Sequence, residues 1–220
     1  MLSYLGQFTL NLSLALYFIH FLPQLYHNIY KPNYNNISLN TQVMYLGATS
    51  LDLIYGLGFN YQWQYIAVDI VYLSTLSIQQ FQLMYARIFS IFIHILSFLW
   101  IIFIVITAVV LVRLGHKSQG FHIGSNDNLI FWISGYISSF LWIILWFPQI
   151  IKNFFYKTSG GYSLPFIVIG VIITLSDITS ALIYHWKWLN LLTSIINFLS
   201  YFCLFIQSCS LKKQQLYSKI

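Results

Sequence analysis

The acidic side chains are the residues of this sequence with the clearest potential for chemistry, and all four are aspartates. Asp127 lies in a polar segment, whereas Asp52, Asp69 and Asp177 lie in long apolar runs. Because a carboxylate in hydrocarbon is unfavourable, acids inside membranes usually face a polar or water-filled cavity. A simpler alternative is a protonated aspartate bonded to a neighbouring Ser or Thr. Since an apolar surrounding favours the neutral carboxyl, we hypothesise that one of the three binds and releases a proton.

Other polar side chains within the apolar runs can line the same cavity or join helices. We include Asn197 in the candidate site for the proton or a solute. The others are more often hydrogen-bond partners between helices than ligands; they are His20, His94, Gln79, Gln80 and Gln207. The two cysteines, Cys203 and Cys209, do not form a zinc-binding pattern. With no nucleophile triad or phosphate loop either, the sequence predicts no enzyme, no metal and no cofactor.

The elements that must position these groups are membrane helices. Of the 220 residues, 59% are hydrophobic and 6% are charged, whereas a soluble domain carries roughly 25% charged residues. A span needs about 20 apolar residues, so the chain has room for seven. Hydropathy places them at Tyr4–Leu25, Leu39–Phe59, Tyr65–Tyr85, Ile88–Leu111, Leu129–Ile151, Ser163–Tyr184 and Trp188–Cys209. The formal net charge of +6 comes from scattered basic residues, which argues against a nucleic-acid partner.

The basic residues predict the orientation in the membrane, because Lys and Arg are enriched on the cytoplasmic side. One side carries seven of them: Lys31, Arg87, Lys152, Lys157, Lys212, Lys213 and Lys219. The other side carries Arg113, Lys117 and Lys187. The N-terminus is therefore expected outside or in a lumen, and the C-terminus in the cytosol. In this orientation the three aspartates of the apolar runs lie in the non-cytoplasmic half of the membrane.

An internal repeat is the strongest organisational signal. A shift of 125 residues without a gap aligns ten identical residues in 41 positions. The pairs are Pro23 and Pro148, Gln24 and Gln149, Asn28 and Asn153, Ser38 and Ser163, Leu39 and Leu164, Val43 and Val168, Thr49 and Thr174, Asp52 and Asp177, Leu57 and Leu182, and Trp63 and Trp188. Because rare polar residues are among the pairs, the match is not the chance similarity of two apolar segments.

The repeat predicts an all-α membrane protein of seven transmembrane helices. Three helices reverse the direction of the chain, and the single span Ile88–Leu111 restores it, so that the two repeats run parallel. The predicted divisions are a first three-helix bundle at 1–87, a linker helix and loop at 88–128, a second bundle at 129–211 and a cytosolic tail at 212–220. This is a 3+1+3 arrangement.

A proline and a glutamine stand together near the cytosolic end of the first helix in each repeat. Pro23 and Pro148 each remove a hydrogen bond within the helix, which produces a kink. The following Gln24 and Gln149 can bond to exposed backbone or to a neighbouring helix. We predict that the two pairs are hinges for alternating access. A static kink is the alternative.

The doubled pattern, a Pro-Gln pair followed by Asn28 or Asn153 and by Ser38-Leu39 or Ser163-Leu164, resembles the PQ-loop repeat family. That family includes the lysosomal exporters of cystine and of cationic amino acids, and its fold is similar to that of the SWEET sugar carriers. The resemblance implies a transporter of small solutes, often coupled to protons, with both Pro-Gln loops in the cytosol. The position of the acid in cystinosin-like proteins corresponds here to Gly170, with Asp177 two turns further on, so the substrate stays open.

Together these features predict a proton-coupled transporter of an amino acid of the cystine or cationic type, whose partners are the solute, the proton and the bilayer. An uncoupled sugar-type carrier, a seven-helix receptor or scaffold, and a lipid scramblase are the alternatives. The final residues, Tyr217-Ser218-Lys219-Ile220, resemble a lysosomal sorting signal. A lysosomal or vacuolar membrane is thus one expected location and a bacterial inner membrane the other. The oligomeric state stays open.

Overall fold

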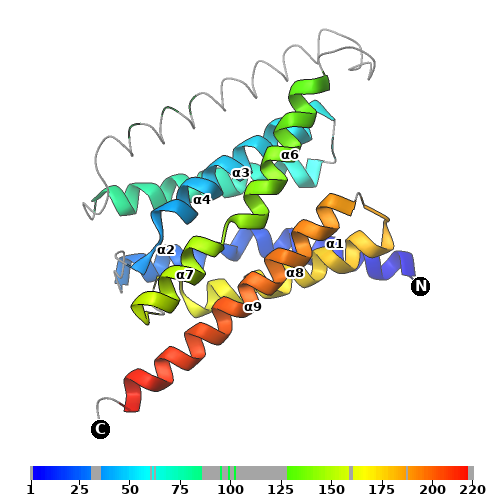
Figure 1. Ribbon diagram of the computed structural model, residues 1–220. Helices are drawn as coiled ribbons and strands as arrows, with labels where there is room; N and C mark the ends of the chain where they lie inside the picture. Colours follow the sequence, from blue (N-terminus) through cyan, green and yellow to red (C-terminus); the bar gives the residue numbers. More distant parts are fainter. Residues whose placement is uncertain are drawn as a thin grey trace. The chain divides into compact units, whose positions relative to one another are not determined.

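The computed structural model describes residues 2–30, 36–59, 61, 63–85, 95, 99, 102, 128–158, 161–186 and 188–217. These residues form helices and contain no strand. The helices are α1 (Leu2–His20), α2 (Leu22–Tyr30), α3 (Leu39–Gly58), α4 (Trp63–Tyr85), α6 (Asn128–Ile144), α7 (Phe147–Tyr156), α8 (Leu164–Ile183) and α9 (Trp188–Tyr217) (Figure 1). Asp127, His94 and most of the predicted span Ile88–Leu111 lie outside the described residues, as does the tail from Ser218.

Six of the seven predicted spans coincide with described helices or helix pairs. Within the described part of the chain, four stretches are long and apolar enough to cross a membrane: Tyr4–Tyr30, Phe131–Tyr156, Leu164–Ile183 and Trp188–Leu211. Helices α3 and α4 are less apolar because they carry aspartates and several glutamines. The chain is therefore a helical protein of the multi-pass membrane type, and the complete 3+1+3 order stays a prediction.

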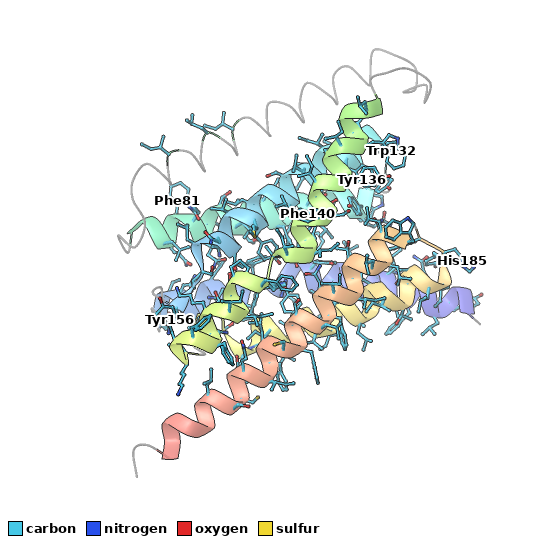
Figure 2. The ribbon with its side chains drawn as sticks, in the orientation of Figure 1. Phe81, Trp132, Tyr136, Phe140, Tyr156 and His185 are labelled. Atoms are coloured by element: carbon cyan, nitrogen blue, oxygen red, sulfur yellow. The ribbon has the colours of Figure 1, made fainter. Side chains whose placement is uncertain are left out.

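Many polar groups lie inside beside an apolar core, and many large apolar side chains lie outside, which differs from the usual distribution in water-soluble proteins. The buried amide side chains are those of Gln24, Asn28, Gln42, Gln79, Gln80, Gln149, Asn153 and Asn197. Figure 2 shows Trp132, Tyr136 and Phe140 following one another along α6, and the last two are 57% and 60% exposed. In hydrocarbon, this arrangement satisfies the polar groups internally and presents an apolar surface to lipid.

The helix boundaries reproduce the internal repeat. Shifting α3 by 125 residues gives Leu164–Ile183, which are the bounds of α8, and the same shift moves the start of α4 at Trp63 to the start of α9 at Trp188. The start of α2 at Leu22 likewise moves to the start of α7 at Phe147. The repeat seen in the sequence is therefore a repeat of structural elements.

The described helices form two compact units, and each unit combines helices from both repeats. Unit 1 comprises residues 1–42 and 143–220 and contains α1, α2, α7, α8 and α9. Within it, α8 packs against both α1 and α9 (Figure 1). Unit 2, residues 43–142, contains most of α3 and α6 and all of α4. In each unit, the first helix of one repeat therefore packs with later helices of the other repeat. The predicted division of the chain into bundles at 1–87 and 129–211, joined by a linker at 88–128, stays a prediction.

The first helix breaks just before its proline in both repeats. Proline has no N–H to donate to the carbonyl four residues earlier, and accordingly α1 ends at His20 and α6 ends at Ile144. The helix resumes with the same bond each time, since the Leu25 N–H donates to the Phe21 carbonyl and the Ile150 N–H to the Trp146 carbonyl, both at 2.9 Å. The helix is interrupted near the proline in both repeats, and the role of these interruptions as moving hinges stays a prediction.

A close approach in unit 2 depends on a glycine. A Cβ atom added at Gly58 of α3 would lie 2.3 Å from the ring of Phe131, which is 4% exposed. At Gly47 of the same helix, the nearest atom would be 3.4 Å away, on Leu141. Of these two positions, Gly58 is the one where a neighbouring ring must move to admit a methyl group.

We therefore expect Gly58→Ala to lower the free energy of unfolding by about 1–3 kcal/mol, as overpacked cores do. Gly47→Ala is the matched control, and alanine's higher helix propensity makes it neutral or stabilising by up to about 1 kcal/mol. Unfolding monitored by tryptophan fluorescence in detergent measures both. Equal stability of the two variants would contradict this packing.

Candidate functional site

Asp177 is held in unit 1 by two hydroxyl groups of α1. The Ser13 hydroxyl donates to Oδ1 and the Tyr17 hydroxyl to Oδ2, the latter at 2.6 Å. Ser13 is buried and one helical turn from Tyr17, so α1 presents both donors on one face. A carboxylate only accepts hydrogen bonds, and this arrangement satisfies both of its oxygens.

Further polar contacts join α1 to α8 on either side of this aspartate. The hydroxyls of Thr9 and Ser180 lie 2.8 Å apart and are buried. On the other side, His20 is 1% exposed and its ring stacks on Phe166 at 4.1 Å between centroids. Its Nε2 lies 3.1 Å from the Phe166 carbonyl. Because a carbonyl only accepts, Nε2 carries a hydrogen and donates.

Asp52 occupies the corresponding place in unit 2. The side chains of Tyr65, Ser138 and Trp142 lie within hydrogen-bonding reach of its carboxyl. The Ser138 hydroxyl also has a second acceptor, the Ala48 carbonyl at 2.9 Å. Tyr65 belongs to α4, whereas Ser138 and Trp142 belong to α6. Asp52 is therefore surrounded by donors from two helices.

The partners of the two aspartates are related by the repeat. Adding 125 to Ser13 and Tyr17, which hold Asp177, gives Ser138 and Trp142, which surround Asp52. Each aspartate is thus reached from the first helix of the other repeat. The partners could have been sought in the sequence, because the ungapped shift continues upstream of Pro23 and aligns Ser13 with Ser138. The same shift aligns Tyr17 with Trp142, which are different residue types, so sequence identity does not reveal this second pair of partners.

Asp52 lies close enough to Asp69 of α4 to act on it electrostatically. Its side chain is 4% exposed, and its Oδ2 atom has no hydrogen-bond partner among the described residues. Tyr65, one turn before Asp69, contacts Asp52. The structure therefore brings Asp52 and Asp69 together within unit 2 and places Asp177 in unit 1.

Asn197 lies on α9 in unit 1 and is 6% exposed. Its amide donates to the Thr193 carbonyl at 3.0 Å, within its own helix. The Oδ1 atom has no partner among the described residues. A buried amide with a free acceptor can take a hydrogen bond from a solute or from water.

The glutamines of the Pro-Gln pairs form two reciprocal clasps, both within unit 1. Gln24 accepts from the Ser163 N–H at 2.7 Å and donates to the Gly161 carbonyl at 3.1 Å. Gln149 accepts from the Ser38 N–H at 2.7 Å and donates to the Asn36 carbonyl at 2.9 Å.

The two clasps are equivalent under the 125-residue shift. In each, the glutamine also donates to the asparagine four residues on, Asn28 or Asn153, at 2.8 Å. Ser163 is the N-cap of α8, and its hydroxyl accepts from the Phe166 N–H. Each glutamine therefore fastens the segment before the second helix of the other repeat.

The comparisons with known proteins bear on the second repeat. The model of the PQ loop repeat family matches residues 130–190, which span α6, α7, α8 and the start of α9. No curated protein matches the chain. The matched segment includes Pro148 and Gln149, and the structural repeat gives the first half of the chain the same elements. The chain therefore carries a PQ loop repeat at residues 130–190.

Proposed function

We propose that the chain is a membrane transporter which moves an amino acid of the cystine or cationic type together with a proton, by alternating access. The observation that carries this proposal is the partly buried carboxyl of Asp177, held by two hydroxyls among apolar helices. A carboxylate in such a place binds an amino group by charge-assisted hydrogen bonds. The PQ loop repeat and the four candidate spans support a solute carrier over an enzyme.

Three functions are assigned to different residues. Asp177, with Asn197 on the neighbouring α9, provides contacts for the polar groups of the solute. Asp52 and Asp69 provide the carboxyls that exchange a proton. The Pro-Gln pairs provide the hinges, because each proline is the second residue of the helix that follows an interruption. These residues are Pro23, Gln24, Pro148 and Gln149.

Uptake into liposomes tests the proposal against its alternatives. Purified protein is reconstituted, and cystine, arginine, lysine and a hexose are offered with and without a pH gradient. The proposal expects accumulation of an amino acid that the gradient accelerates. Hexose uptake without pH dependence would indicate the sugar-type carrier, and binding without uptake would indicate a receptor. Flipping of a lipid probe with no solute uptake would indicate a scramblase.

The hydroxyl donors of Asp177 give a finer test. We expect the double variant Ser13→Ala with Tyr17→Phe to reduce uptake by about tenfold or more, because hydrogen bonds to charged groups contribute about 1.5–3 kcal/mol each. Ser74→Ala is the control, since that hydroxyl is exposed and bonds to the Ile70 carbonyl of its own helix. Unchanged uptake in a correctly folded double variant would contradict the role of this site.

A further inference from the structure

The two carboxyls of unit 2 form what we call the acid pair, Asp52 of α3 and Asp69 of α4. Tyr65 links them, since it contacts Asp52 and lies four residues before Asp69 on one face of α4. Asp69 is 4% exposed and its Oδ2 atom has no partner among the described residues. A buried carboxylate oxygen without a donor is strongly unfavourable. The contacts therefore favour a proton on Asp69.

The charges around the acid pair lead to the same conclusion. The described residues of unit 2, which are 43–59, 61, 63–85, 95, 99, 102 and 128–142, include no Lys, Arg or His. The titratable groups that face the pair from the α3–α4 connection and from α4 are the hydroxyls of Tyr61 and Tyr65. The Tyr61 hydroxyl donates in turn to the Tyr55 hydroxyl of α3. On α6 the neighbours are Ser138 and Trp142, which do not titrate. With no cation among these described residues, two adjacent carboxyls inside the helices of unit 2 strongly disfavour ionising together.

We propose that Asp52 and Asp69 form a single proton-binding site, in which Asp69 holds one proton, Asp52 carries the charge, and the pair instead of Asp177 exchanges the transported proton. This inference rests on the proposed transport function. Asp52 is the better charge carrier because three donor side chains surround it. When the coupled proton arrives from water, an O–H bond forms on Asp52 and the pair becomes neutral. Release of that proton to water restores the single negative charge.

The repeat shows why Asp177 has a different role. The residue that corresponds to Asp69 is Ser194, and the residue that corresponds to Tyr65 is Asn190. Asp177 therefore has no second acid at the equivalent position. Both of its oxygens accept from hydroxyls. Only the repeat-related copy in unit 2 has the neighbouring carboxyl that a shared proton needs.

Infrared spectroscopy of the purified protein tests the protonation without any assay of transport. The parent protein and Asp177→Asn should both show the carbonyl band of a protonated carboxylic acid at neutral pH. The isosteric Asp69→Asn should lack it, because Asp52 alone is ionised among its donors. Persistence of the band in folded Asp69→Asn would overturn the proposal, as would its loss in Asp177→Asn.

The pH dependence of uptake tests the exchange of the transported proton. In Asp69→Asn the half-maximal pH should rise by about one unit, because the singly charged pair loses the second carboxyl that shares its proton. Asp177→Asn should keep the parental half-maximal pH. Asp69→Ser, which introduces the residue of the other repeat, should behave as Asp69→Asn does, and Asp69→Glu should restore the parental value. A half-maximal pH that moves with Asp177 and not with Asp69 would overturn the proposal.

Failure of this inference is distinguishable from failure of the proposed function. If the parent protein transports an amino acid under a pH gradient and the Asp69 variants keep its pH profile, the acid pair is wrong and the transporter stands. If the parent transports no solute, the proposed function is wrong, and the infrared band still reports whether the pair holds a proton.

Discussion

Replacement of Gln24 by leucine is expected to lower the free energy of unfolding by about 2–6 kcal/mol. The change removes the acceptor of the Ser163 N–H and the donor to the Gly161 carbonyl, both in a buried setting. A buried backbone group left unpaired costs about 1–3 kcal/mol. Gln149→Leu should have an effect of similar size, because its bonds to Ser38 and Asn36 are equivalent.

Denaturant unfolding in detergent measures this effect, and Gln7→Leu is the matched control. Gln7 is exposed on α1, and its amide lies 3.5 Å from the Asn11 side chain. Surface changes of this kind usually stay within about 0.5 kcal/mol. If Gln24→Leu were as stable as Gln7→Leu, the clasp would not hold the segment before α8.

Replacement of Asp177 by asparagine is expected to reduce the affinity for the solute by about 10- to 100-fold. The variant keeps the size of the side chain and removes its charge. A hydrogen bond to a charged group contributes about 1.5–3 kcal/mol, and each 1.4 kcal/mol corresponds to about a tenfold change in affinity. We expect the loss in KM, because the contact binds the amino group of the solute before and during transport.

Thr179→Ala is the control for this variant. Thr179 lies on the same helix, and its hydroxyl donates to the Leu175 carbonyl at 2.9 Å. Initial rates of uptake over a range of solute concentrations separate KM from the maximal rate. A parental KM in folded Asp177→Asn would exclude the carboxylate as the binding group for the amine.

The helices and the repeat could be predicted from the sequence because both rest on local patterns. Long apolar runs locate the spans, and the ungapped shift predicts that Leu39 and Leu164 are equivalent, as the helix starts show. The helix interruptions before Pro23 and Pro148 were predictable for the same reason, since a missing N–H acts within its own helix.

The lateral partners of the helices could not be predicted in this way. A shift pairs residues that are equivalent, such as Gln24 with Gln149, and does not say which residues touch. The contact of Gln24 with the segment around Ser163 depends on packing between α2 and α8, which are distant in the chain. Likewise, three apolar runs with one aspartate each do not reveal that Asp52 and Asp69 are neighbours while Asp177 lies in unit 1.

Proton movement caused by the solute tests the central claim most directly. Liposomes that contain the protein and a trapped pH indicator start with the same pH inside and outside. Cystine, arginine or lysine is then added outside. The account predicts that one of these amino acids acidifies the interior as it enters, and that Asp69→Asn weakens this response. Entry of the amino acid with no change in internal pH would contradict proton coupling, and no entry of any of the three would contradict the proposed substrate class.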